Sequence, residues 1–417
     1  MITDRIWRFL TSLRLTVVLL AFSVLLVFVG TIAQADEGLY VAQERYFKHW
    51  IVWGISFFGH GLPVPLPGGY LLGTLLFANL LASHIKRLEW TWRKLGIHLI
   101  HAGVILLLVG QLTSDLFSHE TQMRFVEGQT FHYSESPQNF ELAFVTGADA
   151  ETDEVVAIPA PLLAHGGELR HGSLPFTVRV KNYWPNSDLS FRAPMQQNAP
   201  PLAKNGLARS FDFTSVPETR KMEERNVPTA VIELVSPKGS LGTWVATGWS
   251  TDETLVVNVR ANFIRQAGQE MADQIIGRLV APQTVQANGR TWSFALRPMR
   301  VYNPFSLTLL KTTHKVYPGT DIPKDFRSRV RIENPRTGEN REVDIFMNSP
   351  LRYGGMTFYQ YQMGRDEVNA NRGTSTLQVV RNPSWLAPYA GCIIVGAGLC
   401  VQFMIHLVGF VSRKKTA

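Results

Sequence analysis

The sequence predicts a membrane protein with four transmembrane α-helices, three N-terminal and one C-terminal, and a large extracytoplasmic β-rich, sandwich-like domain. Three observations support this fold class. Four apolar stretches approach the roughly 20 residues that a helix needs to cross a bilayer. The polar block between the third and fourth stretches contains runs of alternating apolar and polar residues, as half-buried strands do. Basic clusters flank the apolar stretches on one side only, which orients them.

The apolar stretches define the domain organisation. The predicted spans occupy residues 15–33, 69–85, 95–112 and 385–411. The second is the least apolar, because lipid penalises Asn79, Ser83 and His84 unless they face other helices or water. We therefore expect three domains: an N-terminal membrane domain at 1–112, an external domain at 113–383, and a C-terminal span with a short tail at 384–417.

Positive charge predicts the topology. Basic residues precede the first span, separate the second from the third, and follow the fourth: Arg5, Arg8, Arg14, Lys86, Arg87, Arg93, Lys94, Arg413, Lys414 and Lys415. The positive-inside rule then places both termini in the cytoplasm and the large domain outside. Because the net charge of +8 gathers at these membrane ends, it indicates topology rather than nucleic-acid binding. The absence of a transit-like leader favours a bacterial plasma membrane.

The first span has an alternative interpretation. Its basic start, its apolar run and the triplet Ala33-Gln34-Ala35 resemble a cleavable signal peptide. The apolar run is longer than the core of an ordinary signal peptide, and two more spans follow closely. We therefore expect it to be retained as a membrane helix.

An aromatic segment at 46–58, YFKHWIVWGISFF, lies in the loop between the first two spans. Its continuous apolar core is too short to cross a bilayer, and its Trp and Tyr content favours a helix lying in the outer interface. His49 and His60 flank it, either as ordinary interfacial residues or as an external ligand or relay.

The external block has the pattern of a β-domain, as one large domain or two smaller ones. Residues 174–184 alternate Phe176, Val178 and Val180 with polar neighbours, which predicts a strand with one buried face. Turn sequences at 236–240 and 334–338 predict hairpins over 227–246 and 327–347. Residues 261–280 are predicted to be helical, and 193–209 to form a long loop.

Several functions are excluded by what the sequence lacks. Both cysteines, Cys392 and Cys400, lie in the last span, so the external block can hold no disulfide, zinc knuckle or C-x-x-C pair. The chain has no P-loop, G-x-S-x-G or H-E-x-x-H motif, and we assign no catalytic residue. The predicted cytoplasmic pieces are too short to fold alone. The protein is therefore expected to act through membrane-embedded groups or through partners.

Three histidines are predicted to gather at the inner end of one helical hairpin. His84 ends the second span, and His98 and His101 share a face at the start of the third. A short basic turn joins the two spans, so they are antiparallel neighbours. Ionisable groups within spans are functional candidates by default. Imidazole suits an axial ligand for haem iron, but histidines at this depth also snorkel or bond a neighbouring helix. His406 in the last span is a weaker candidate.

Several motifs resemble the ResB (CcsB) family of cytochrome c biogenesis proteins. They are SLRLTVVLLAFSVLLVFVGTIAQ in the first span, the hairpin GGYLLGTLLFANLLASHIKR with KLGIHLIHAGVILLLVG, Pro323-Lys-Asp-Phe-Arg327, NSPLRYGGMTFYQ at 348–360, and Asn382-Pro-Ser-Trp385. They occur in the order that the family has. The resemblance is weak over about residues 140–310.

The resemblance implies a subunit of a system II cytochrome c synthase, non-catalytic or co-catalytic. With a CcsA-type partner, it would carry haem b across the membrane and support its attachment to C-x-x-C-H motifs of apocytochromes c. In the family a transmembrane histidine ligates haem in transit, which ranks His101, in LIHAG, first, His84 second and His98 third. The chain lacks the tryptophan-rich external segment of the CcsA half, so the partner is required. A thioredoxin-like protein would reduce the apocytochrome thiols.

Two rival functions remain open. The chain is alternatively a membrane-anchored scaffold that binds apocytochrome and ligates no haem itself. A transporter of another solute is a more distant alternative, because four spans without internal symmetry make a poor alternating-access machine.

The segment at 348–360 also has two interpretations. Gly354 and Gly355 permit a bulge or a close backbone approach, and Tyr353, Phe358 and Tyr359 can stack on a porphyrin or grip a partner. Aromatic residues at this spacing equally fill a β-sandwich core, which we regard as the better interpretation.

Overall fold

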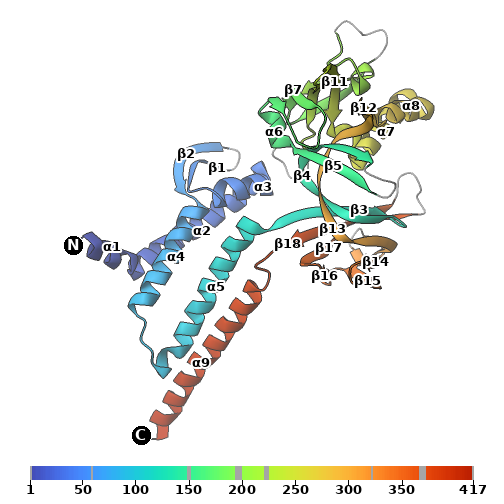
Figure 1. Cartoon of the computed structure of the whole chain (residues 1–417). Helices are drawn as coiled ribbons and strands as arrows, with labels where there is room; N and C mark the ends of the chain where they lie inside the picture. The colour runs from blue at the N-terminus through green and yellow to red at the C-terminus, as the bar shows by residue number, and fades with distance from the viewer. Residues whose placement is uncertain are drawn as a thin grey trace. The chain divides into compact units, whose positions relative to one another are not determined.

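The structure is a computed structural model that describes residues 2–57, 60–147, 152–192, 200–219, 225–320, 323–365 and 372–415 (Figure 1). Its described residues form two compact units. Unit 1 combines the N-terminal part through residue 119 with the C-terminal part from residue 381. Unit 2 contains residues 120–219 and 225–380.

Unit 1 is mainly helical. Its elements are α1 (Ile2–Leu10), α2 (Leu13–Glu37), α3 (Leu39–Ala42), the π-helix η1 (Gln43–Phe47), β1 (Ile51–Phe57), β2 (His60–Pro67), α4 (Gly69–Lys86), the 3₁₀-helix η2 (Trp92–Lys94), α5 (Leu95–Phe117) and α9 (Ala387–Lys415).

Three helical segments in the described part of the chain are long and apolar enough to cross a membrane: Leu13–Ala35, Trp92–Phe117 and Ala387–Val411. They contain most of the predicted spans at 15–33, 95–112 and 385–411. The remaining predicted span, 69–85, forms the helix α4, but this helix does not reach the same apolar length. Its role as a fourth span therefore stays a prediction.

The segment at 46–58 does not form the predicted interfacial helix. Its apolar core is strand β1, which pairs antiparallel with the proline-rich strand β2. Gly54 has a φ of +74° where the register of the pair shifts, a conformation that favours glycine. A short run of β-branched and aromatic residues suits a strand as well as a helix, and here the partner strand decides between them.

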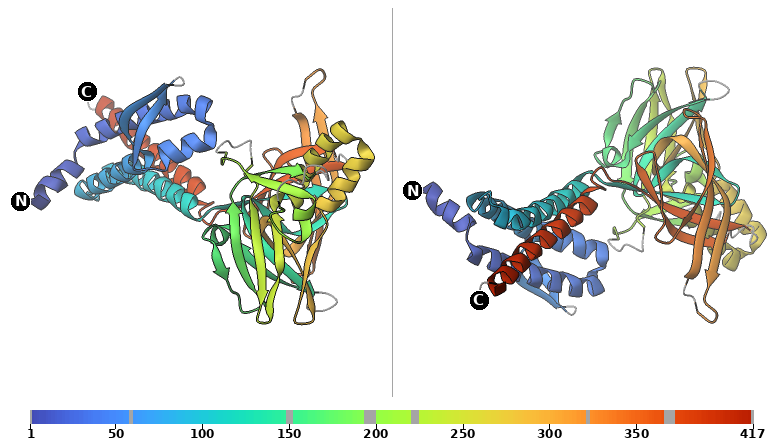
Figure 2. Two further views of the ribbon diagram at one scale, coloured as in Figure 1. Left: turned by 90° about the horizontal axis from the view of Figure 1, so that it is seen from above. Right: turned by 90° about the horizontal axis from the view of Figure 1, so that it is seen from below.

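Helices α5 and α9 lie side by side (Figures 1 and 2). Gly96, Gly103 and Gly110 are buried on α5, seven residues apart, and face α9. A Cβ atom on Gly103 would lie 2.6 Å from Cγ2 of Val395. Small residues let two helix backbones approach closely, which is how helices associate in a bilayer.

A buried hydrogen-bond network joins α4 to the N-terminal helices. Asn79 on α4 is only 2% exposed. It accepts from the hydroxyl of Thr16 on α2 at 2.6 Å and donates to the carbonyl of Leu10 at 2.6 Å. The side chain of Asn79, which makes α4 a weak candidate for a span, therefore has hydrogen-bond partners on the neighbouring helices. This is the condition that we expected from the sequence for a polar residue within a span.

Unit 2 is mainly β. Its strands are β3 (His119–Val126), β4 (Thr130–Gly147), β5 (Asp153–Pro159), β6 (Gly167–Leu169), β7 (Thr177–Trp184), β8 (Ser187–Phe191), β9 (Phe211–Ser215), β10 (Thr229–Ser236), β11 (Gly239–Thr247), β12 (Gln283–Ala287), β13 (Arg290–Val316), β14 (Pro323–Asn334), β15 (Glu339–Phe346), β16 (Leu351–Tyr353), β17 (Met356–Arg365) and β18 (Gly373–Arg381). Its helices are α6 (Ala160–Ala164), η4 (Gly206–Arg209), η5 (Gly248–Ser250), α7 (Glu253–Ala267) and α8 (Gln269–Leu279).

Two larger sheets organise unit 2. One has four strands in the order β11-β10-β7-β6. The other has ten, with the path β15-β14-β13-β4-β3-β18-β17-β16, and with β5 on β4 and β12 on β13. The first core lies between the four-stranded sheet and one end of β4 and β13, around Phe144, Val178 and Trp292. A second core lies among β3, the far end of β13 and β14–β18, around Phe305 and Phe358.

Most predicted elements of this unit are present. The strand at 174–184 is β7, with Phe176, Val178 and Val180 buried. The two predicted hairpins are β10–β11 and β14–β15. The predicted helix at 261–280 is instead a pair, α7 and α8, broken at Gly268 with a φ of +82°. Of the predicted loop at 193–209, residues 193–199 lie outside the described residues and 206–209 form η4.

The segment at 348–360 forms the hairpin β16–β17. Gly354 and Gly355, with φ of +60° and +76°, make a two-residue turn rather than a bulge. Phe358 is fully buried in the second core, and the Tyr353 hydroxyl donates to Glu339 Oε2 at 2.7 Å. These two aromatic residues are structural, whereas Tyr359 is exposed.

Candidate functional site

The candidate site lies where α4 ends and α5 begins. His84 occupies the last turn of α4, and His98 and His101 occupy the first two turns of α5. The connection at 87–94 is short, so both helix ends stay close together. All three imidazoles are half-buried. We call these three residues the histidine cluster.

The three rings gather around His84, as the sequence predicted. Nδ1 of His84 lies 3.2 Å from Nδ1 of His101. The ring centroid of His84 lies 5.4 Å from that of His101 and 5.3 Å from that of His98, each pair nearly perpendicular. His84 is therefore the central ring of the cluster.

Two residues of the connecting turn hold His98. Its Nε2 lies 2.9 Å from the carbonyl oxygen of Glu89, and its ring packs 5.8 Å from Trp90. A carbonyl oxygen only accepts, so Nε2 carries the hydrogen. In the neutral ring the lone pair is then on Nδ1, a buried atom without a hydrogen-bond partner among the described residues. Sequence reasoning missed these partners, because a backbone carbonyl leaves no signal in a sequence.

The hydrogen bond between His84 and His101 makes their two rings complementary. One Nδ1 must donate and the other accept. The donating ring keeps a lone pair on its own Nε2, whereas a neutral accepting ring carries a hydrogen there. Metal-ligating histidines usually donate their second N–H to such an acceptor, which fixes the tautomer and raises the basicity of the ligand. The neutral pair therefore offers one Nε2 lone pair, supported by the other ring.

The cluster suits one axial ligand better than chelation of a bare ion. Among the described residues no group of three or more His, Cys, Asp or Glu side chains is arranged to hold a metal ion. Haem iron is held by its porphyrin and needs only one or two axial ligands from protein. Lys86 donates to the hydroxyl of Thr11 at 3.0 Å and Lys94 pairs with Glu89, while Arg87 and Arg93 are exposed beside the cluster.

Of the other histidines considered from sequence, His406 and His49 have local partners. His406 bonds Gln402, one turn earlier on α9, at 2.9 Å. Nδ1 of His49 donates to the carbonyl of Glu44 at 2.7 Å, at the end of η1. His60 begins β2. The two cysteines are free thiols on α9.

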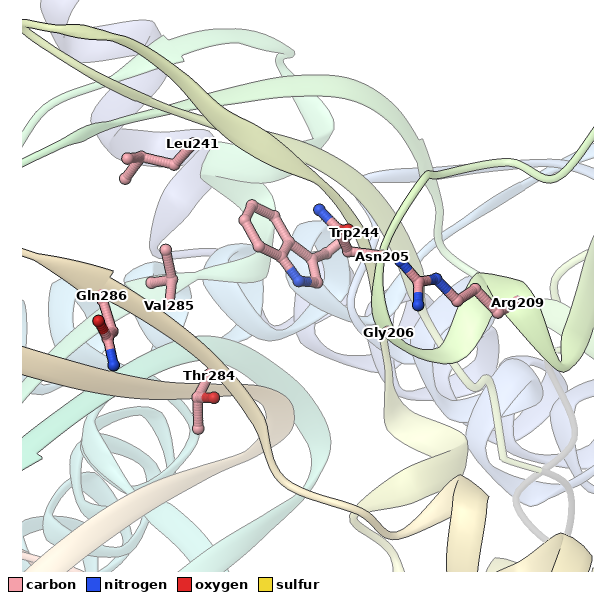
Figure 3. Close-up of a pocket in the computed structure, with 8 residues that line it drawn as sticks. All are labelled: Asn205, Gly206, Arg209, Leu241, Trp244, Thr284, Val285 and Gln286. Carbon is pink, nitrogen blue, oxygen red and sulfur yellow. The ribbon is translucent and has the colours of Figure 1, made fainter.

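Unit 2 has an open hollow of about 400 Å³ between η4, β11 and β12 (Figure 3). The indole of Trp244 lies at its centre, with Asn205 beside it and Val285 and Thr284 on the facing strand. Among the described residues that line it, Arg209 is the only charged one, and its Nε donates to the carbonyl of Lys204 at 2.9 Å. The described lining includes no histidine or carboxylate.

Comparison with known proteins connects the fold to a family. Residues 255–374, which run from α7 to β18, match the model of the ResB-like family. The chain is also similar to Protein NrfI of Wolinella succinogenes, with 34% identity over 105 residues. That alignment covers 25% of this chain and only 11% of the relative, so the chain spans a small part of that protein.

The matched region includes two motifs that carry the resemblance, at 323–327 and 348–360. It also begins at residue 255, inside the stretch where the resemblance is weak from sequence. The motifs of the N-terminal spans and the motif at 382–385 lie outside it. Over residues 255–374, this chain is therefore similar to the ResB-like family.

Proposed function

We propose that this protein is a subunit of a system II cytochrome c synthase. With a CcsA-type partner, it moves haem b across the membrane and supports haem attachment to the C-x-x-C-H motifs of apocytochromes c. The match of residues 255–374 to the ResB-like family supports the biogenesis role. The observation that carries the haem-handling role is the histidine cluster, which presents one supported Nε2 lone pair at the end of a helical hairpin.

The proposed topology places unit 2 outside the plasma membrane and both termini in the cytoplasm. Helix α4 has 18 residues, so it spans about 27 Å at 1.5 Å per residue, close to the thickness of the hydrocarbon core. The hydrogen bonds of Asn79 to neighbouring helices remove the main polar obstacle to its insertion. With α4 as a fourth span, the basic turn at 87–94 lies on the cytoplasmic side, together with the histidine cluster.

Within this proposal the cluster takes haem from the cytoplasmic side. The Nε2 of one imidazole binds the iron, with His101 our first choice, His84 second and His98 third. The second ring of the pair orients that ligand through the Nδ1–Nδ1 hydrogen bond. Arg87 and Arg93 are exposed in the turn beside the cluster, and such cations would pair with the propionates of the cargo.

The experiment is a complementation assay in cells that lack this protein but contain its CcsA-type partner. The wild-type chain and a variant with His84, His98 and His101 all replaced by Ala are expressed at equal levels in the membrane. We expect the triple variant to lose covalent c-type cytochromes, measured by haem stain after denaturing electrophoresis. The matched control is His165→Ala, because His165 is an exposed imidazole of unit 2 that bonds a local carbonyl.

This assay also separates the rival function. A scaffold that holds apocytochrome without ligating haem would keep full cytochrome assembly in the triple variant. That outcome, with normal membrane levels of the protein, contradicts haem ligation by the cluster.

A further inference from the structure

The strand β12 lies at an edge of its sheet. Among the described strands it pairs with β13 alone, through a two-residue turn at Asn288 and Gly289, whose φ values are +48° and +74°. In a hairpin with such a turn, the two residues that flank it exchange both of their backbone hydrogen bonds. Ala287 and Arg290 are that pair, so every second residue counted back from Ala287 bonds to β13.

The backbone groups of Thr284 and Gln286 therefore point away from β13. Each residue offers one N–H and one C=O to the space beside the sheet. The same register explains why the carbonyl of Thr291, opposite Gln286, faces β4 and accepts from the hydroxyl of Thr146 at 3.0 Å. Among the described residues, none bonds to the backbone of Thr284 or Gln286. We call these four backbone groups the β12 edge.

The β12 edge lacks the features by which natural proteins block the addition of another strand. Exposed edges usually carry charged side chains or prolines. The edge strand β5 does so, with Asp153, Glu154 and Pro159. Strand β12 reads Gln-Thr-Val-Gln-Ala and contains neither. An unprotected edge invites pairing with another chain, which is a hazard unless such pairing is its role.

The β12 edge also borders the open hollow of about 400 Å³ in unit 2 (Figure 3). Trp244 and Leu241 of β11 line this hollow as well. Gln283 closes one end of the edge, because its Nε2 crosses to β11 and donates to the carbonyl of Val245 at 2.8 Å. A strand added to β12 would therefore lie beside an apolar surface with room for one of its side chains.

We propose that the β12 edge binds an extended polypeptide segment by strand addition, with one large apolar side chain packed on Trp244 in the hollow. In strand addition, main-chain hydrogen bonds supply affinity and side-chain pockets supply selectivity. Arg209 is the only charged residue among the described lining residues, so a neutral or acidic segment is favoured over a basic one. This inference rests on the proposed function, in which the segment belongs to unfolded apocytochrome c.

The geometry limits the bound segment to a few residues. Thr284 and Gln286 lie about 7 Å apart along the strand. In antiparallel pairing, two residues of the incoming chain can each exchange both backbone hydrogen bonds with one of them. This pairing requires an extended segment with free backbone groups, which an unfolded chain offers and a folded chain has already used.

The test measures binding of apocytochrome c to the purified full chain in detergent. The apocytochrome is reduced, its cysteines are alkylated with iodoacetamide, and a fluorescent label reports binding by anisotropy. Unlabelled apocytochrome and folded holocytochrome c are the competitors, because they share one sequence and differ in available backbone. We expect the unfolded form to compete about tenfold more effectively.

Gln286→Pro is the main variant. Proline removes the N–H group that faces the hollow but none of the hydrogen bonds to β13. We expect it to weaken apocytochrome binding about tenfold, and Thr284→Pro to act in the same direction. Ala157→Pro is the matched control. Ala157 is exposed on the edge strand β5 and alternates with Pro159, so its N–H also faces away from the neighbouring strand.

Hydrogen exchange of the wild-type chain tests the same contact without a substitution. Bound apocytochrome should protect the amides of residues 283–287, because Thr284 and Gln286 then donate to the added strand. The amides of the control edge at 153–159 should exchange at an unchanged rate.

Unchanged exchange at 283–287 in saturating apocytochrome, or no binding of apocytochrome at all, would overturn this inference. Equal losses in Gln286→Pro and Ala157→Pro, or equal competition by holocytochrome, would do the same. These results are separable from failure of the proposed function, which is decided by cytochrome assembly in cells. If assembly depends on the histidine cluster but apocytochrome leaves β12 unprotected, only the strand-addition site fails.

Discussion

Replacing the three cluster histidines one at a time tests the hydrogen-bond pattern of the site. In the structure His101 and His84 share one hydrogen bond at 3.2 Å, and Nε2 of His98 is engaged by the carbonyl of Glu89. With His101 as the ligand, His84 is the ring that accepts from it. The expected order of lost haem affinity is then His101→Ala, His84→Ala, His98→Ala.

The size of each effect follows from these contacts. His101→Ala removes the axial bond and abolishes specific binding. His84→Ala removes the supporting acceptor, and loss of such a partner typically weakens metal binding about 10–100-fold. That corresponds to about 1.4–2.7 kcal/mol. His98→Ala changes affinity by less than about threefold, because the nitrogen that commonly ligates is already bonded within the protein.

The assay is a haem titration of the purified full chain, read from the Soret band. His84→Gln is the rescue variant, because its amide oxygen can accept from Nδ1 of His101. We expect it to recover most of the affinity lost in His84→Ala. A largest loss in His98→Ala, or equal small losses in all three variants, would refute this account of the cluster.

Two further predictions concern stability. Gly103→Leu places a side chain against α9, so we expect overpacking to destabilise the α5–α9 pair by about 1–3 kcal/mol. Thermal unfolding in detergent measures this loss. Gly73→Leu is the control, because Gly73 lies at an open position on α4 and its replacement should change little. Equal melting of both variants contradicts the packing. The hydrogen bond from Lys181 is the main cause that lowers the pKa of Glu233 from the ordinary 4.5 to about 2. The ionised carboxylate therefore stabilises the fold above about pH 4.5, and this stabilisation is lost as the pH falls towards 2. Glu233→Gln should therefore flatten the acid dependence of unfolding in that window, and an unchanged dependence by circular dichroism counts against the assignment.

The sequence locates the long apolar helices well where no strongly polar residue interrupts the apolar run. Three of the four predicted spans lie on helices of sufficient apolar length. The fourth, α4, carries Asn79 within it, and no property of that helix alone reveals that Thr16 satisfies this residue. A hydropathy value is calculated for each helix alone, whereas the free-energy cost of a polar group within the bilayer depends on the hydrogen-bond partners that neighbouring helices supply.

The error at 46–58 has a different origin. A run of nine apolar residues is too short for its periodicity to separate helix from strand. Its pairing with β2, which contains Pro63, Pro65 and Pro67, is a tertiary feature. Prolines in a strand are tolerated where their missing N–H groups face away from the partner.

For the candidate site, the sequence predicts which residues meet but not how they are hydrogen-bonded. The short basic turn between two helices implies that the three imidazoles meet, and they do. Which nitrogen bonds which partner depends on side-chain and backbone geometry that the sequence does not contain.

Haem ligation by the histidine cluster can be tested through the haem content of the purified chain. Wild-type protein, the triple variant of His84, His98 and His101, and His165→Ala are purified from the membranes of haem-replete cells, and absorption spectra are recorded at equal protein concentration. We expect a Soret band in the wild type and in His165→Ala, and at most a small residual band in the triple variant. Undiminished haem in the triple variant would contradict haem ligation by the cluster.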